Sequence, residues 1–268
     1  MKINKLSALL LALLTALSCA AYAFVCTSSR TLPIAAASAD TVDDAVIASE
    51  AVGESASAGE FFTERDLEQS ADLSEAVCYT VSDGAVIRIS EEGVYVLMGS
   101  AAEAVVYVDA PDDAKVQLVL DGLTITNRDT ACIYVENADK VFVTTSADSA
   151  LAVTGTFQAD RGDGAIFSRS DLALNGTAAL TISSTANGIV GKDDLKITGG
   201  SYRITASSKA IDANDSIRIA GGSFALNAGT DGLHAENNDD DSLGWIYIGG
   251  GTFVIDAGDD GIHGTSLV

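Results

Sequence analysis

The feature of this sequence that most limits its fold is an internal repeat in its second half. The dipeptides that mark the repeat recur at a spacing of 22 residues, at Gly188-Ile189, Ala210-Ile211 and Gly232-Leu233. Ala165-Ile166 precedes the first of them by 23 residues, and Gly261-Ile262 follows the last by 29. A nearly fixed period of this length predicts a repeat architecture, in which each unit packs on its neighbours.

Each repeat predicts three short strands separated by turns. In one repeat they cover 189–190, 195–197 and 202–204, and in the next 211–212, 217–219 and 224–226. Glycine pairs fall at the same phase of successive repeats, where a positive φ lets the backbone turn: Gly199-Gly200, Gly221-Gly222 and Gly250-Gly251. Stacking such coils buries one continuous apolar column. We therefore expect a right-handed, single-stranded parallel β-helix over residues 77–268, with ~22 residues per coil.

Other all-β folds fit the repeat less well. Sandwiches and barrels also use short strands and glycine turns, but they lack a fixed period. A nonapeptide calcium roll has a shorter unit than this one. In the β-helix we expect an inward ladder of Ile166, Ile189, Ile211, Leu233 and Ile262. The aromatic column Tyr202, Phe224 and Phe253 alternates with polar neighbours, which favours core packing over a sugar-binding platform.

The N-terminus has the pattern of an export signal. Lys2 and Lys5 precede an apolar run from Leu9 to Leu17, and Ala21-Tyr22-Ala23 is a small-x-small cleavage pattern. The run is shorter than the ~20 apolar residues that span a bilayer. We expect a signal peptide over 1–23 and a secreted or cell-surface protein, with a lipid anchor on Cys19 as the alternative.

Residues 24–76 are rich in Ala, Ser, Asp and Glu and have little periodicity, which predicts a low-complexity linker. Three cysteines remain after cleavage, Cys26, Cys78 and Cys132, and this odd number excludes a dense disulfide framework. Cys78 and Cys132 are one possible pair. The alternative is that Cys132 is a core residue, since it lies in an apolar strand pattern.

The mature chain is strongly acidic. Without residues 1–23 it has 38 acidic and 13 basic residues, a net charge of 13 − 38 = −25. This charge argues against nucleic acid as a partner. Divalent cations outside the cell would offset the repulsion, whereas the simpler alternative is that the charge only confers solubility.

Several acidic residues fall where the repeat would stack them. Asp231 and Asp260 occupy one column, Asp259 precedes Asp260, and Asp163 has a similar setting before a glycine. Stacked strands are about 4.8 Å apart. Two carboxylates this close repel by about 1 kcal/mol in water and by more near a protein surface. Calcium, which binds six to eight oxygen ligands, would turn the repulsion into attraction.

The insertion that lengthens the last repeat is also acidic. It contains Asp239, Asp240 and Asp241. We expect it to contribute to a calcium site, with an ordinary solvated loop as the alternative.

The two histidines of the chain, His234 and His263, align in one column with Asp212. Such a column is able to bind a sugar hydroxyl, transfer a proton or bind zinc. Zinc is less favoured than calcium, because no third nitrogen or sulfur ligand is evident. The alternative is a structural hydrogen-bonded column.

A calcium-dependent lyase would need a basic residue beside the bound uronate, and Lys192 and Lys209 are the candidates. Neither lies in a diagnostic motif. We therefore predict no catalytic residue.

Four segments resemble the secreted carbohydrate-binding domain proteins first recognised in clostridial cellulose degraders. They are 165–168, 193–200, 231–235 and 259–263, and the run 116–127 fits as well. Membership would imply a parallel β-helix that binds calcium and plant-wall polysaccharides, with distant similarity to family 9 pectate lyases. The Asp-Gly-Ile-His pattern occurs at Asp260–His263 and, with leucine for isoleucine, at Asp231–His234, but Asn187–Val190 and Lys209–Asp212 depart from it.

We therefore expect a calcium-dependent protein that binds cellulose, pectate or another acidic polysaccharide without cleaving it. The alternatives are a uronate lyase and a structural surface protein or adhesin. We expect a monomer without a membrane span, and a β-helix left incomplete by the end of the sequence at Val268.

Overall fold

The computed structural model describes residues 61–267. The predicted signal peptide, Cys19, Cys26 and most of the predicted linker lie outside the described residues. No helix within the described range is long and apolar enough to cross a membrane.

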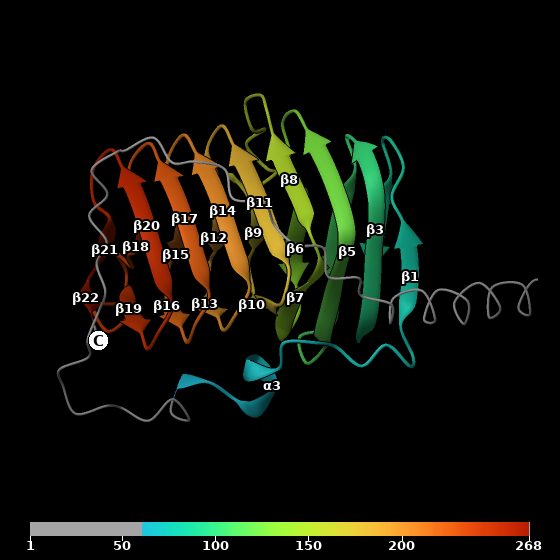
Figure 1. Cartoon of the computed structure of the whole chain (residues 1–268), viewed down its shortest axis with the longest axis horizontal. Helices are drawn as coiled ribbons and strands as arrows, with labels where there is room; N and C mark the ends of the chain where they lie inside the picture. The colour runs from blue at the N-terminus through green and yellow to red at the C-terminus, as the bar shows by residue number, and fades with distance from the viewer. Residues whose placement is uncertain (1–60, 268) are drawn as a thin grey trace, which may run out of the picture. The chain divides into compact units, whose positions relative to one another are not determined.

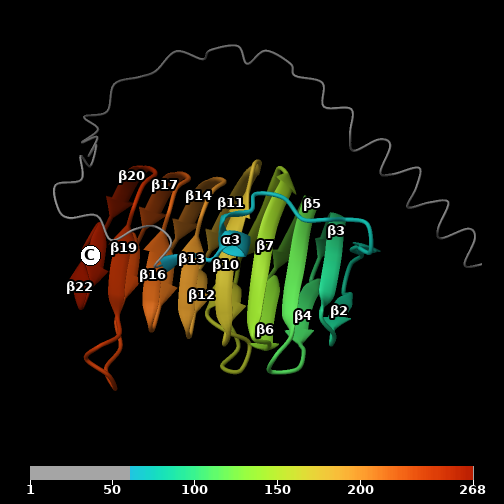
Figure 2. The ribbon, with the colours of Figure 1, turned by 90° about the horizontal axis from the view of Figure 1, so that it is seen from below.

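The described chain is built almost entirely from parallel strands that stand side by side (Figure 1). One sheet has eight strands, each contributed by a different coil (Figure 2). In spatial order these strands are β2 (Val86–Ile89), β4 (Val105–Asp109), β6 (Ile133–Asn137), β9 (Gly164–Ser168), β12 (Asn187–Gly191), β15 (Ile211–Ala213), β18 (Leu233–Ala235) and β21 (Ile262–Gly264).

The other sheet has fourteen strands and divides into two limbs. Its shared part is β1 (Val77–Thr80), β3 (Gly93–Ala102) and β5 (Lys115–Asn127). One limb is β7 (Lys140–Ala147), β10 (Asp171–Gly176), β13 (Asp194–Ile197), β16 (Ser216–Ile219), β19 (Trp245–Ile248) and β22 (Ser266–Leu267). The other limb is β8 (Ser149–Val153), β11 (Ala179–Ser184), β14 (Ser201–Ala206), β17 (Ser223–Ala228) and β20 (Thr252–Ala257).

Strand β5 joins the limbs because it is long enough to pair with both. Residues Lys115–Leu120 pair with β7, and Thr124–Asn127 pair with β8. Between them Gly122 has a φ of 70°, a left-handed conformation that glycine adopts without strain. The chain therefore bends from one limb to the other at this glycine.

The strand register follows the sequence repeat. Ile189 pairs with Ile211, Ile211 with Leu233, and Leu233 with Ile262. The last step is longer in sequence, and the residues between β18 and β19 absorb the difference. The parallel β-helix expected from the repeat thus has the predicted partners in this part of the chain.

The predicted core is confirmed over most of its length. The isoleucine–leucine ladder from Ile166 to Leu233 is fully buried, whereas Ile262 in the last strand of the sheet is 40% exposed. The rings of Tyr202 and Phe224 are stacked 5.3 Å apart and lie in the core, which confirms packing rather than a sugar platform. Cys132 is a buried free cysteine, so it forms no disulfide with Cys78. Burial raises the pKa of the Cys132 thiol to about 12.

The structure corrects the prediction that residues 61–76 belong to a low-complexity linker. They include the short helix α3 (Glu64–Leu67), capped by Thr63, and the side chain of Phe62 is buried. Helix α3 lies against the limb that contains β7, β10 and β13 (Figure 2). Composition missed this segment because a few specific contacts, rather than a periodic apolar face, hold it in place.

Candidate functional site

One column of side chains runs along the outside of the eight-stranded sheet. We call it the outer column. Its members are paired in register from strand to strand and comprise Arg88, Tyr107, Tyr134, Phe167, Val190, Asp212, His234 and His263.

Strand alternation explains why this column faces outward. Residues on either side of it, such as Ile133 and Val135, belong to the main core. Tyr134, Phe167 and Val190 instead form a separate apolar cluster. Since successive side chains of a strand point to opposite faces, the two clusters lie on opposite faces of one sheet.

The first half of the outer column is aromatic. The rings of Tyr107 and Tyr134 are 5.5 Å apart with an angle of 7° between their planes, and those of Tyr134 and Phe167 are 5.1 Å apart at 24°. Tyr134 and Phe167 are buried, whereas Tyr107 is half-buried. Of these three rings, Tyr107 is therefore partly accessible to solvent, whereas Tyr134 and Phe167 are covered by their neighbours.

Cationic side chains flank this aromatic half. The Arg88 guanidinium lies 5.0 Å from the Tyr107 ring centre. Arg169 and Lys192 lie 5.6 and 5.9 Å from the Phe167 ring centre. Arg88, Tyr107 and Arg161 line one cleft, and Phe167, Arg169 and Lys192 line another. Carboxylates line the same clefts, Glu136 and Asp160 in the first and Asp160 and Asp163 in the second, and Arg169 lies 3.3 Å from Glu136. Charges of both signs therefore surround the aromatic half.

The second half of the outer column is ionic. Buried Asp212 accepts a hydrogen bond from His234 Nδ1 at 2.8 Å and pairs with Lys209 Nζ at 3.1 Å. Burial alone would raise the pKa of Asp212, but the hydrogen bond with His234 and the charge of Lys209 hold it below its usual value. Asp212 is therefore an anion that orients the histidine.

His263 repeats this arrangement one strand further on. Its ring is stacked on that of His234, with centroids 4.9 Å apart, and its Nδ1 atom lies 3.0 Å from Asp260 Oδ2. The hydrogen bond with Asp260 raises the pKa of His263. The structure thus brings together Asp212, His234 and His263 as the sequence alignment placed them.

A carboxylate that the sequence analysis did not assign to the histidines joins them. Glu236 Oε2 lies 3.6 Å from His234 Nε2. His234, Glu236 and His263 each have a ligand atom within 4.8 Å of the others. Strand alternation offered the signal, because residues 234 and 236 share a face.

The aspartates expected to stack for calcium lie in different settings. Asp231 is buried, and its carboxylate accepts a hydrogen bond from the Asp260 backbone N–H at 3.2 Å. Asn187 makes the equivalent bond to the Lys209 N–H at 3.0 Å. Asp259 and Asp260 are exposed. Asp231 therefore connects consecutive coils through the backbone.

Asp163 is the acidic position whose surroundings best fit a cation. Its Oδ2 atom accepts a hydrogen bond from Asn187 at 3.1 Å, while Oδ1 is buried and has no partner among the described residues. An unsatisfied buried carboxylate oxygen is costly unless a cation or donor reaches it. Asp163 also lines the cleft beside Phe167, together with Asp160.

The acidic insertion satisfies several of its own oxygens. Asn237 Oδ1 accepts from the backbone N–H groups of Asp239 and Asp240, and Asp240 Oδ1 accepts from Ser242. Asp239, Asp240 and Asp241 are exposed. The hydrogen bonds from Ser242 lower the pKa of Asp240.

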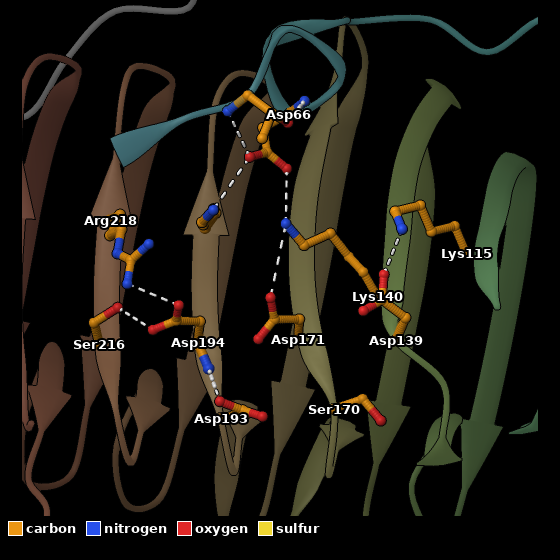
Figure 3. Close-up of polar contacts among 12 residues, drawn as sticks. Asp66, Lys115, Asp139, Lys140, Ser170, Asp171, Asp193, Asp194, Ser216 and Arg218 are labelled. Atoms are coloured by element: carbon orange, nitrogen blue, oxygen red, sulfur yellow. Dashed lines mark hydrogen bonds and ion pairs between the residues drawn. The ribbon is translucent and has the colours of Figure 1, made fainter. Parts of the chain in front are cut away.

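A second group of charged side chains lies on the limb that carries β7, β10 and β13 (Figure 3). We call it the Asp66 cluster. Asp66 is fully buried and binds Lys140 at 3.1 Å and Lys196 at 3.2 Å. Burial alone would raise the pKa of Asp66, but the Thr63 N–H and the two lysines lower it below the usual value. Sequence reasoning missed this cluster because Asp66 meets strands that are 74 and 130 residues away in the chain.

The Asp66 cluster continues along the same limb. Asp171 lies 3.7 Å from Lys140, and burial raises its pKa to about 6. Asp194 pairs with Arg218 at 2.7 Å. Phe61 stacks on Tyr247 with ring centres 4.3 Å apart. Residues 61–66, which precede the β-helix in the chain, therefore cover this charged and aromatic face.

Comparison with known proteins gives consistent matches. A family model described as carbohydrate-binding domain-containing protein matches residues 83–268. A carbohydrate-binding domain-containing protein of Acetivibrio thermocellus is 33% identical over 128 residues, which are 45% of each chain. The match thus spans less than half of that relative.

A solved structure is also similar. It is the polysaccharide lyase-like protein from C. thermocellum, described as a gadolinium derivative. It is 25% identical in sequence, with a TM-score of 0.63, and the alignment covers 69% of this chain and 93% of the other.

Proposed function

Because the chain belongs to the family of carbohydrate-binding domain-containing proteins, we propose that it binds an acidic polysaccharide, of the plant cell-wall type, outside the cell. We further propose that calcium supports this binding and that the chain does not cleave the glycan. The acidic composition, the predicted export signal and the aromatic half of the outer column support the proposal.

The observation that carries the proposal is the grouping of Arg88, Arg169 and Lys192 around the stacked rings of Tyr107, Tyr134 and Phe167. Aromatic faces pack against apolar surfaces such as the faces of sugar rings. Guanidinium groups bind carboxylates with two parallel hydrogen bonds. Tyr134 and Phe167 are buried, so an acidic polysaccharide would contact the half-buried ring of Tyr107 and use the flanking cations for its carboxylates.

Calcium would have two roles in such binding. It would neutralise carboxylates of the protein and bridge them to carboxylates of the glycan. The unpartnered Oδ1 atom of Asp163, in the cleft beside Phe167, makes Asp163 the first ligand that we assign. Asp231, Asp259, Asp260 and the loop residues 239–241 are further proposed ligands. The similar structure was obtained as a gadolinium derivative, and gadolinium, like calcium, is a hard cation that prefers oxygen.

The test is affinity electrophoresis through polygalacturonate, with a pull-down on cellulose, in the presence of calcium or of a calcium chelator. We expect retardation of the wild type with calcium and at least a tenfold weaker affinity for Arg88→Gln and Tyr107→Ala. Arg203→Gln is the matched control, because Arg203 is exposed on β14, outside the outer column. Binding by no acidic or insoluble glycan would refute the proposal.

A uronate lyase is the second candidate. The polysaccharide lyase-like description of the similar structure and the position of Lys209 beside Asp212 favour it. Lysis would create an unsaturated uronate, which absorbs in the ultraviolet. We expect no such product from polygalacturonate with calcium at high protein concentration. A product that disappears in Lys209→Met would replace binding with catalysis as the function.

A further inference from the structure

We propose that His234, Glu236 and His263 form a binding site for one divalent transition-metal ion of the zinc type. Its three ligands differ from the calcium ligands proposed above, because two of them are imidazole nitrogens. Asp260, which was proposed there as a calcium ligand, supports His263 here from the outer shell. Zinc, cobalt, nickel and copper prefer imidazole, whereas calcium prefers a shell of oxygens. The site does not depend on whether the chain binds polysaccharide.

Two acidic side chains prepare the histidines for this role. Asp212 lies at hydrogen-bond distance from Nδ1 of His234, 2.8 Å away, and Asp260 from Nδ1 of His263, 3.0 Å away. A carboxylate only accepts hydrogen bonds, so each Nδ1 atom carries the proton. In the neutral ring the Nε2 atom then has the free lone pair. A histidine held by a carboxylate in this way is the usual outer-shell arrangement of metal-binding histidines.

The third ligand lies on the side of His234 away from Asp212. Glu236 Oε2 is 3.6 Å from Nε2 of His234, on the side opposite Asp212. The three residues have ligand atoms within 4.8 Å of one another. A tetrahedral ion with bonds of about 2.0–2.1 Å brings its ligands to about 3.3–3.5 Å apart. The ligand atoms must therefore approach one another by at most about 1.5 Å.

The burial pattern shows which residues make this movement. The His234 side chain is 10% exposed and is fixed by buried Asp212. The Glu236 and His263 side chains are 45% and 44% exposed, so rotamer changes are open to both. We infer that the ion binds first to the fixed histidine and draws in the other two ligands. Three protein ligands leave a fourth position for water or an external ligand.

The test uses the full chain without a histidine tag, freed of metal with a chelator. Cobalt is titrated in, and its visible absorption is followed, because the ligand-field bands report nitrogen coordination and low coordination number. We expect saturation at one cobalt per chain, displacement by zinc, and no displacement by an equal concentration of calcium. Glu236→Gln and His263→Gln should each weaken cobalt binding by at least about tenfold.

Asp256→Asn is the matched control, because Asp256 is exposed on β20, outside the outer column, and its substitution removes an acidic charge but keeps the three ligands. It should bind cobalt as the wild type does. Circular dichroism must show that each variant is folded. Equal affinity in wild type and in both ligand variants would mean an adventitious ion only, and displacement by calcium would also overturn the proposal. Neither outcome bears on polysaccharide retention, which is measured separately.

Discussion

The outer column and the Asp66 cluster have similar origins but different surroundings. Both arise where parallel strands stack in register, so that polar residues of successive coils become neighbours. In the Asp66 cluster, helix α3 delivers a carboxylate from outside the repeat, and this carboxylate binds Lys140 and Lys196. In the outer column, the carboxylates Asp212 and Asp260 bind only one side of each histidine ring.

The charged side chains of the Asp66 cluster stabilise the fold, whereas we propose that those of the outer column bind a ligand. The side chains of Asp66, Lys140 and Lys196 are 0%, 12% and 9% exposed, and their polar groups bind one another. The side chains of Glu236 and His263 are about half exposed, and Glu236 lies 3.6 Å from Nε2 of His234. The same periodic scaffold thus gives a closed ionic cluster on one face and ligand atoms directed at solvent on another.

The largest expected effect is on the closed cluster. Asp66→Asn removes the buried anion between two nearly buried ammonium groups and leaves Lys140 only the more distant Asp171, so we expect the free energy of unfolding to fall by about 3–5 kcal/mol. Urea denaturation at neutral pH measures the change. Glu64→Gln, an exposed residue in the same helix, is the control and should change stability by less than about 0.5 kcal/mol. Equal stability of both variants would mean that helix α3 does not stabilise the β-helix.

The next effect concerns the outer column. Asp212→Asn keeps the shape of the side chain but removes the charge that supports His234. We expect cobalt to bind about 10–100-fold more weakly, as is typical when an outer-shell carboxylate is lost. Titration of the metal-free protein measures this. An unchanged affinity would show that His234 needs no support from Asp212.

A smaller effect depends on pH and again concerns the Asp66 cluster. Burial raises the pKa of Asp171 to about 6, above its value of 3.8 in a model compound. Between about pH 4 and 6 the folded state therefore binds more protons than the unfolded state, and this carboxyl makes folding less favourable as pH rises.

Asp171→Asn removes that penalty, so we expect the variant to be more stable than the wild type by about 1–2 kcal/mol at pH 8. The gain should decrease as the pH falls through about 6 and be absent near pH 4. Thermal melts across this range test the sign. A constant difference between the two proteins would assign the effect to packing rather than to the charge of Asp171.

The smallest effect is expected in the acidic insertion. Its three aspartates are exposed, and asparagine oxygens are able to accept the same local hydrogen bonds. The triple variant Asp239→Asn, Asp240→Asn and Asp241→Asn should change the free energy of unfolding by less than about 0.5 kcal/mol. A large loss of calcium-dependent stability in this variant would transfer the main calcium site from Asp163 to the insertion.

Much of the second half of the fold could be predicted from the sequence. The spacing of Ile189, Ile211 and Leu233 identified strand partners, because a constant number of residues per coil returns the chain to the same position. The same reasoning placed His234 beside Asp212. It also placed Tyr202 and Phe224 in the core, where strand alternation puts them.

The first half of the outer column could not be predicted in this way. The steps from Tyr107 to Tyr134 and from Tyr134 to Phe167 are 27 and 33 residues (134 − 107 and 167 − 134), which differ from the later period. Turns of variable length absorb these differences while the strands still pair. No fixed spacing in the sequence therefore indicates that these three rings form one stack.

The sequence by itself determined that the chain forms stacked coils, which residues line their interior in the second half, and which histidines meet. These features follow from a local period, which is visible in any stretch of the chain. Only the tertiary structure decided that Asp66 closes the cluster of Lys140 and Lys196, and that the rings from Tyr107 to Phe167 form one column. Those contacts join residues with no common spacing, and they form because the folded β-helix brings their strands side by side.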